Sequence, residues 1–360
     1  MKHSSLVVLT VLGSVVSLYL KVPEVRALTI KLTSTENSEA NLGFRKAADF
    51  WESKFTDDII VNINTGFEDL GKDILGQAFS TTVSTNYTNI HNALSNDITS
   101  SDDTIAVNNL QPIPAFNLLI NQTSDNPNSD SEIPYLDNDG SKNNSTIWMT
   151  TANAKALDFS INKETIDAEI TFNTKFDFDF DNTNGIEKGK FDFEAIAIHE
   201  IGHALGFISG VDILDAQILS SNNENALKFV STLDLYRYSD ESFDKNALDW
   251  TADTREKYFS IDGGVTRKGT FSTGLFFGDG RQASHWKDNL ELGIMDPTFA
   301  PEELGIVTDL DLLAFDVIGW DPREEKPIQD ISEPSSILGM LLTITGSFLL
   351  QTIKRSNANS

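Results

Sequence analysis

The amino-acid sequence predicts an α+β fold, and three kinds of observation support this prediction. Apolar residues recur at helical spacing over 39–55 and again over 309–318. Apolar and polar residues alternate over 59–63 and 168–173, as they do in half-buried strands. The chain has 360 residues, of which 39% are hydrophobic, so it can bury a sizeable core.

The first predicted helix and strand follow one another directly. The helix places Phe44, Ala48 and Trp51 on one face, and the strand alternates from Ile59 to Ile63. A helix followed by a strand suits the first lobe of a domain that mixes both elements.

Residues 95–145 are rich in Ser, Asn and Asp and contain several prolines, so we expect loops there. Within this stretch, Asp137, Asp139 and Gly140 fit a solvated turn better than a calcium-binding loop. Calcium (Ca²⁺) is kept as the second interpretation of these residues.

The strand predicted over 168–173 is followed by a second alternating stretch, Asp177 to Asp181. We expect its Phe side chains to face the core and its Asp side chains to face water. Asn182, Asn184 and Gly185 follow directly, so calcium is a secondary interpretation here as well.

Residues 192–206 combine the signals of a complete helix with the pattern HExxH. Asp192 is the expected N-cap, and Gly206 suits a left-handed C-terminal cap. His199 and His203 lie four positions apart on one helix face, so both can bind one metal ion at about 2.0–2.1 Å. Glu200 points about 100° around the helix and can take a proton from a water at the metal.

A catalytic zinc site generally has three protein ligands and one open position. The sequence has five histidines and no cysteine, so the third ligand has few candidates. His3 lies at the extreme N-terminus, and His91 lies in a polar stretch with nothing metal-like beside it. His285 is therefore the leading candidate by elimination. Asp212 is its nearest rival, because a carboxylate also binds zinc.

The segment between the two parts of this site, residues 208–284, is long for a connection. Strand patterns at 233–238 and 257–261 predict an ordered insertion. After it, the helix over 309–318 is expected to end at Gly319.

The run His199 to Phe207, the histidine in Ser284-His285-Trp286 and a methionine ten positions later resemble the metzincin clan of zinc endopeptidases. In most metzincins the third histidine stands three residues after the glycine, where this chain has Ser209. Leishmanolysin-like members place an insertion at this point, as this chain does. The resemblance implies a twisted, mostly parallel sheet with an active-site helix. It also implies a C-terminal subdomain that contains a Met-turn and a terminal helix.

The same resemblance implies a role for each matching residue. It assigns Glu200 as the general base and Met295 as the Met-turn residue that floors the metal site. It assigns the strand over 168–173 as the cleft-edge strand that pairs with an extended polypeptide substrate. The implied zinc (Zn²⁺) ligands are His199, His203 and His285.

Residues 1–27 have the layout of a secretory signal peptide. Lys2 supplies the positive start, an apolar region spans 6–20, and Val25-Arg26-Ala27 is the expected cleavage site. An uncleaved membrane anchor is the alternative. Residues 28–322 then form the predicted metalloprotease domain.

The C-terminal end has three parts after a charged linker over 323–332. Glu333-Pro334 precedes an apolar stretch over 337–353, and Lys354-Arg355 follows it. Residues 333–355 resemble the PEP-CTERM sorting signal of bacterial exported proteins, and 356–360 remain as a short tail. The resemblance implies recognition by an exosortase-type processing enzyme, with transient inner-membrane association before release to the cell surface or the extracellular space. A plain membrane anchor is the alternative.

The formal charge of −27 makes nucleic acid and anionic membrane surfaces poor partners for the folded part. The absence of cysteine excludes disulfides and thiolate metal ligands. The sequence thus predicts a secreted or cell-surface zinc endopeptidase that uses a zinc-activated water and a glutamate base. Two alternatives stay open, a non-catalytic zinc-stabilised surface or matrix protein and a zinc amidase acting on cell-wall peptides. The substrate, and whether 28–165 contains a removable propeptide, also stay open.

Overall fold

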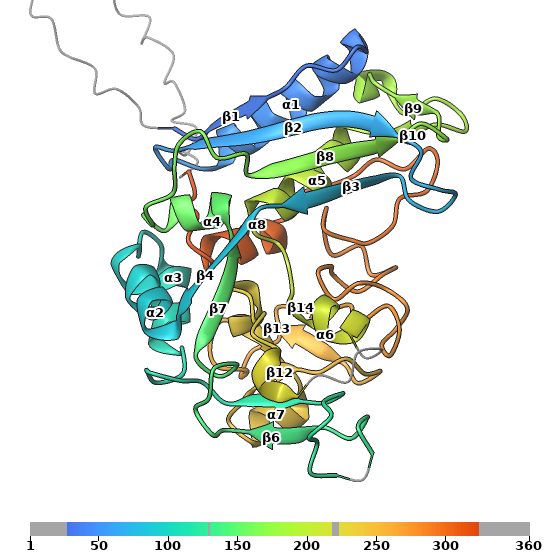
Figure 1. Cartoon of the computed structure of the whole chain (residues 1–360). Helices are drawn as coiled ribbons and strands as arrows, with labels where there is room; N and C mark the ends of the chain where they lie inside the picture. Colours follow the sequence, from blue (N-terminus) through green and yellow to red (C-terminus); the bar gives the residue numbers. More distant parts are fainter. Residues whose placement is uncertain (1–26, 129, 218–222, 324–360) are drawn as a thin grey trace, which may run out of the picture. The chain divides into compact units, whose positions relative to one another are not determined.

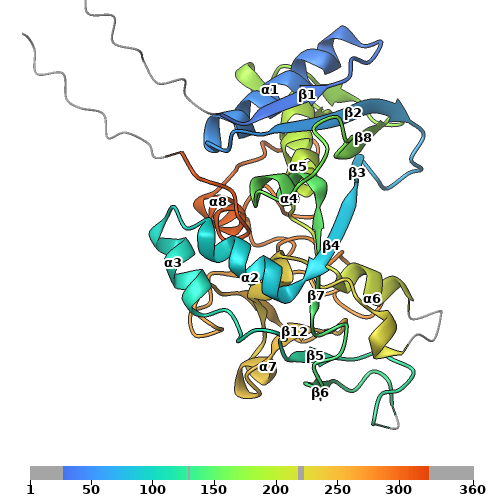
Figure 2. The same cartoon turned by 60° about the vertical axis from the view of Figure 1, so that its left-hand side comes forward.

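The structure is a computed structural model that describes residues 27–128, 130–217 and 223–323. The predicted signal peptide, apart from its last residue, lies outside the described residues. So do the sorting signal, the tail and all of the linker except Arg323. The described chain contains both helices and strands, with its strands in several small sheets, which confirms the α+β fold class (Figures 1 and 2). No helix within these ranges is long and apolar enough to cross a membrane.

A four-stranded, mostly parallel sheet forms the first part of the fold. Strands β1 (Thr29–Leu32), β2 (Ile60–Glu68) and β8 (Ala168–Asn173) run parallel in this order, and β3 (Gly76–Ser80) pairs antiparallel with β8. The prediction that 168–173 is the cleft-edge strand is wrong, because β8 has a partner on each side. The edge strand beside β8 is β3, whose five residues, Gly76–Ser80, were not predicted as a strand.

Two helices pack on one face of this sheet. Helix α1 (Ser38–Lys54) confirms the first predicted helix, and α5 (Phe193–Leu205) carries the HExxH motif. The ring of Phe172, on β8, lies 5.2 Å from that of Phe44 and 4.3 Å from that of Phe193. Since one side chain contacts both helices, α1 and α5 cover the same face of the sheet. The metal motif is thereby anchored to the largest core of the protein.

The prediction of loops over 95–145 is wrong in part, because two helices and two strands lie within this stretch or extend into it. Ser100 caps the second of these helices through a capping box with Asp103, and the three residues Leu118–Ile120 are fully buried. Helices and strands this short leave little periodicity in a sequence rich in polar residues. The elements of this part are β4 (Thr82–Asn86), α2 (Tyr87–Asn96), α3 (Ser101–Asn108), β5 (Leu118–Ile120), β6 (Tyr135–Asp137), β7 (Thr146–Thr150) and α4 (Thr151–Ala156).

The alternating stretch after β8 is shorter than predicted. Only β9 (Phe178–Asp179) is a strand, and it pairs in parallel with β10 (Phe191–Asp192). Phe178 is buried as expected, but Asp179 is buried too, so the prediction that it faces water is wrong. Its carboxylate accepts hydrogen bonds from the backbone N–H groups of Asp181 and Glu187, which replace the lost hydration.

Within 208–217 and 223–284, the described parts of the long segment after α5, the chain forms helices and strands as predicted, but one of its expected strands is mostly a 3₁₀ helix. Leu233–Tyr236 form that 3₁₀ helix, and only the two residues of β11 continue as a strand. Strand β12 (Leu248–Trp250) pairs in parallel with β5, which joins the insertion to the first half of the chain. The other elements are α6 (Val211–Gln217), a 3₁₀ helix (Glu224–Ala226), β11 (Arg237–Tyr238), α7 (Asp240–Asp244), β12 (Leu248–Trp250), β13 (Lys257–Phe259) and β14 (Gly269–Phe271).

The last described helix, α8 (Asp309–Asp316), begins at a capping box formed by Thr308 and Asp311. The chain leaves it through Gly319, whose φ of +103° only glycine adopts readily. Trp320 is then buried, and its indole N–H donates to the carbonyl of Leu205 at the end of α5 (2.9 Å). The predicted terminal helix is therefore confirmed, and it packs beside the helix that carries the metal motif.

Candidate metal centre

Helix α5 begins and ends where the sequence predicts. The carboxylate of Asp192 accepts the backbone N–H of Ala195 (3.1 Å), which caps the N-terminus. At the other end Gly206 has φ of +126°, and the N–H of Phe207 donates back to the carbonyl of Gly202 (3.1 Å). This cap turns the chain out of the helix one turn after the second histidine.

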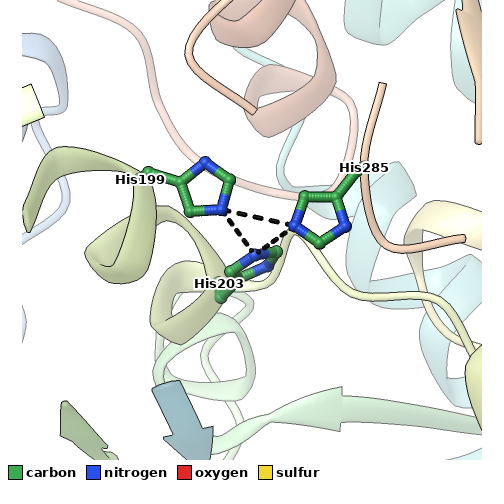
Figure 3. Close-up of side chains that lie close together, drawn as sticks. All are labelled: His199, His203 and His285. Atoms are coloured by element: carbon green, nitrogen blue, oxygen red, sulfur yellow. Dashed lines mark hydrogen bonds between the residues drawn. The ribbon is translucent and has the colours of Figure 1, made fainter. Parts of the chain in front are cut away.

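Three imidazoles from two distant segments meet at one point (Figure 3). The Nε2 atom of His203 lies 3.1 Å from that of His199 and 3.1 Å from that of His285. The Nε2 atoms of His285 and His199 are 3.3 Å apart. The structure therefore places the third histidine where the sequence predicts it, beside the pair on α5.

These distances fit a metal ion. Three nitrogen atoms at about 2.0–2.1 Å from one zinc ion lie about 3.3–3.4 Å apart in a tetrahedral arrangement. The observed separations of 3.1–3.3 Å are close to that value. The three side chains also form a group whose ligand atoms lie within 4.8 Å of one another. The donor set, three imidazoles and no thiolate, is one that zinc uses in catalytic sites.

Hydrogen bonds on the far side of each ring fix which nitrogen faces the shared point. The Nδ1 atom of His199 lies 2.8 Å from the carbonyl oxygen of Ile294, and that of His203 lies 2.7 Å from the carbonyl oxygen of Phe207. His285 is held in the same way by the carbonyl of Gln282 (3.2 Å). A carbonyl only accepts, so each Nδ1 carries the ring proton and each Nε2 presents a lone pair. Three converging lone pairs repel one another unless a cation lies between them.

Burial keeps these rings neutral. It lowers the pKa of His199 to about 3 and that of His203 to about 4, and it holds the pKa of His285 well below its usual value. All three imidazoles are therefore unprotonated at neutral pH, which is the form that binds metal.

The side chain of Glu200 extends from α5 to the edge strand β3. A Cβ atom added at Gly76 would lie 3.2 Å from its Oε1 atom, so the carboxylate is against the backbone of β3. Burial raises the pKa of Glu200 to about 8 in the metal-free protein. No hydrogen bond from the described residues engages this carboxylate, which leaves it available to a water or a substrate.

Asp212 does not compete with His285 as a ligand. Its carboxylate accepts the backbone N–H groups of Ala283 (2.5 Å) and Ser284 (3.1 Å), together with the hydroxyl of Ser284. These bonds direct it to the segment that carries His285 and account for both of its oxygen atoms.

The predicted Met-turn lies against the middle of the motif. A Cβ atom added at Gly202 would meet the sulfur of Met295 at 2.6 Å, so glycine is required where this side chain packs on α5. Met295 is fully buried, and the carbonyl oxygen of the preceding residue, Ile294, accepts the hydrogen bond from Nδ1–H of His199. The turn thus supports the metal site without offering it a ligand.

A second group of acidic side chains contains two of the residues considered for calcium. Carboxylate oxygens of Asp137, Asp139 and Glu224 lie within 4.8 Å of one another. Asp137 is buried and accepts a hydrogen bond from the side-chain amide of Asn143 (2.6 Å). The sequence did not indicate Glu224, because this residue lies in the insertion, far along the chain from Asp137 and Asp139. Asp177, Asp179 and Asp181 belong to neither potential metal group of the described residues.

No family model, curated protein or solved structure matches the chain. Its function must therefore be inferred from the geometry of the site and from the sequence.

Proposed function

We propose that the chain is a zinc-dependent endopeptidase of the metzincin type, with leishmanolysin-like spacing of its ligands. The observation that carries the proposal is the convergence of three neutral imidazoles beside an uncommitted glutamate. His199, His203 and His285 would hold the zinc, and they leave one tetrahedral position open. A purely structural zinc site more often closes with a fourth protein ligand, and no fourth ligand lies in the group formed by the described residues.

A zinc ion bound there would act as a Lewis acid, polarising the scissile carbonyl, lowering the pKa of the attacking water and favouring the charged form of Glu200. The Glu200 carboxylate accepts a proton from that water as its oxygen attacks the carbonyl carbon. The protonated side chain then delivers this proton to the departing amine, so the glutamate is regenerated. The neutral Nδ1–H groups of the histidines stay bonded to carbonyls throughout and keep the rings oriented.

Strand β3 is the part of the sheet suited to align a polypeptide. Within the described residues it pairs only with β8, so its other edge keeps backbone donors and acceptors available to an extended chain. Gly76 on this strand lies beside Glu200, which brings the bound backbone close to the proposed base. The substrate role expected for 168–173 therefore passes to Gly76–Ser80.

The resemblance to metzincins is supported by the mostly parallel sheet with an antiparallel edge strand, by Met295 beneath Gly202 and by the ordered insertion before His285. Export to the cell surface or beyond is part of the proposal and rests on the sequence of the two ends. We propose that an exosortase-type enzyme removes 333–355 after transient inner-membrane association.

A peptide-library assay on the purified chain, with and without a zinc chelator, tests the proposed activity. We expect internal cleavage of unmodified peptides that stops on chelation and returns on addition of Zn²⁺. A chain that binds zinc tightly but cleaves no peptide would support the structural alternative. Cleavage confined to cell-wall peptides would support the amidase.

A further inference from the structure

His285 is flanked on both sides by residues that a carboxylate holds in place, half-buried Asp212 on one side and buried Asp311 on the other. Its neighbour Ser284 is bonded to Asp212 on α6, and its other neighbour, Trp286, is bonded to Asp311 on α8. Neither carboxylate touches the rings of the three histidines through any hydrogen bond of the described residues. Both act on the backbone and side chains that determine where His285 points.

On the side of Ser284, hydrogen bonds link Asp212 to Ser284 and Ser284 to Ser209, and this chain of bonds is called the relay below. Asp212 accepts the N–H of Ala283 and both the N–H and the hydroxyl of Ser284. The Ser284 hydroxyl oxygen in turn accepts the N–H of Ser209 (2.8 Å), three residues beyond Gly206. The end of α5 and the start of α6 are thus bonded to the segment that returns from the insertion. The carbonyl of Ala283 is held from its other side by Arg237 (3.4 Å).

The bonds on the second side converge on Asp311, which is fully buried. Its Oδ1 atom accepts the indole N–H of Trp286 (2.8 Å) and the N–H of Met295 (3.3 Å). Its Oδ2 atom accepts the N–H of Ile294 (2.9 Å) and that of Thr308 (2.8 Å). Since the carbonyl of Ile294 orients His199, this one carboxylate acts on two of the three metal ligands.

We propose that Asp212 and Asp311 are positioning residues that preform the metal site by fixing His285 from both sides. Asp212 acts on His285 alone, and Asp311 acts on His285 and His199. This inference rests on the proposed function only for the identity of the metal, because its tests measure binding and backbone protection and require no peptide cleavage.

Asparagine keeps the shape of aspartate but replaces one acceptor oxygen by a donor, which faces N–H groups here. We expect Asp212→Asn to lower the affinity for Zn²⁺ by about 10- to 100-fold, the usual effect of removing a residue that orients a metal ligand. Affinity is measured by competition with a chromophoric chelator, and the ligand geometry by the visible absorption of bound Co²⁺.

Asp215→Asn is the matched control. Asp215 lies on the same helix, is buried and accepts two backbone N–H groups of the same insertion, those of Phe276 and Phe277 (2.8 and 2.9 Å). Those residues lie well before His285 in the chain. We expect this variant to lower thermal stability in the same way as Asp212→Asn but to bind Zn²⁺ and Co²⁺ like the parent.

A double-mutant cycle separates positioning from general destabilisation. In a His285→Ala background, Asp212→Asn should cause no further loss of Zn²⁺ affinity, because the ring that it positions is gone. Asp311→Asn should still weaken binding there through His199. An unchanged affinity of Asp212→Asn in the parent, or an equal loss in both backgrounds, would overturn the proposal.

A second variant, Ser284→Ala, tests the proposal if Asp212→Asn does not fold. Ser284→Ala removes the hydroxyl of the relay and keeps the backbone bonds to Asp212. We expect weaker Zn²⁺ binding and faster hydrogen exchange of the Ala283 and Ser284 amides in the metal-free chain. Parent-like affinity with parent-like exchange would contradict the role given to the relay. A parent chain that binds zinc through the histidines but cleaves nothing would reject the endopeptidase proposal and leave this one intact.

Discussion

Helix α5 and the segment from Ala283 to Met295 supply the same candidate metal site, but they are built from different kinds of contact. The helix has its own caps at Asp192 and Gly206, and its core face packs on α1 and the sheet. The returning segment contains little regular structure, and its position depends on hydrogen bonds to Asp212 and Asp311. Helical spacing alone therefore brings His199 and His203 together. The position of His285 depends instead on hydrogen bonds to residues that are distant in the sequence.

Because of this difference, substitutions in the two parts of the site should have different effects. A helix residue four positions from another stays on the same face whatever the rest of the fold does. A ligand in an irregular segment moves when any of its supporting bonds is lost. We therefore expect substitutions near His285 to affect metal affinity in graded steps, and substitutions of the motif itself to have the largest effects.

The largest effect is expected from Glu200→Gln. The amide keeps the shape of the side chain but cannot accept a proton at neutral pH, so peptidase activity should fall by about 10²- to 10⁴-fold. Zinc content, measured by mass spectrometry of the metal, should match that of the parent. Glu194→Gln on the first turn of the same helix, where Glu194 pairs with Lys46 (3.6 Å), should keep full activity. Parent-like cleavage by the Glu200 variant would rule out the proposed base.

The next effect concerns His285, the proposed ligand that follows the insertion. His285→Ala removes one of three nitrogen donors, so Zn²⁺ affinity should drop by more than it does in any positioning variant. The drop is measured by competition with a chelator. His91→Ala is the control, because His91 lies on α2 with its ring against Tyr87. If both variants bind Zn²⁺ equally well, His285 does not contribute to the site.

A smaller effect is expected at the edge strand. Gly76→Ala would place a methyl group 3.2 Å from the Glu200 carboxylate and 3.3 Å from Ile196, so the base must shift. We expect a several-fold loss of kcat with unchanged zinc content. Gly66→Ala on β2, where nothing lies within 4 Å, is the matched control. Equal kinetics for the two variants would show that β3 does not set the position of the base.

The smallest effect is expected on thermal stability, and it depends on pH. Burial, with further contributions from Asp321 and Asp57, raises the pKa of Asp97 to about 8. The folded state therefore binds this proton more tightly than the unfolded state, so stability is lost as pH rises from about 4 to about 8. Asp97→Asn should raise Tm at pH 8 by about 2–4 °C, equivalent to about 1 kcal/mol, and leave it unchanged at pH 4. A gain of equal size at both pH values, or a gain from the exposed control Asp73→Asn, would contradict this origin.

Sequence patterns predicted those elements whose signals are local. Helix α1, strand β8 and the caps of α5 follow from periodicity and from single capping residues. His285 was accessible by elimination, because the chain has only five histidines. These predictions needed no knowledge of which segments meet in space.

The remaining features depend on contacts between distant segments. Strand β3 is only five residues long and becomes a strand because β8 offers it an edge. Asp212 was considered as a rival ligand, since a carboxylate near the motif cannot be distinguished from a hydrogen-bond acceptor by sequence. Glu224 joins Asp137 only through the fold of the insertion. Pairing partners and hydrogen-bond targets of this kind leave no periodic signal.

X-ray absorption at the zinc edge tests the central claim most directly, because it reports the ligands of the bound metal. For the parent protein loaded with one equivalent of Zn²⁺, we expect three imidazole nitrogens at about 2.0–2.1 Å, with the imidazole contribution falling to two in His285→Ala. An identical spectrum in the two proteins would contradict the shared site of His199, His203 and His285.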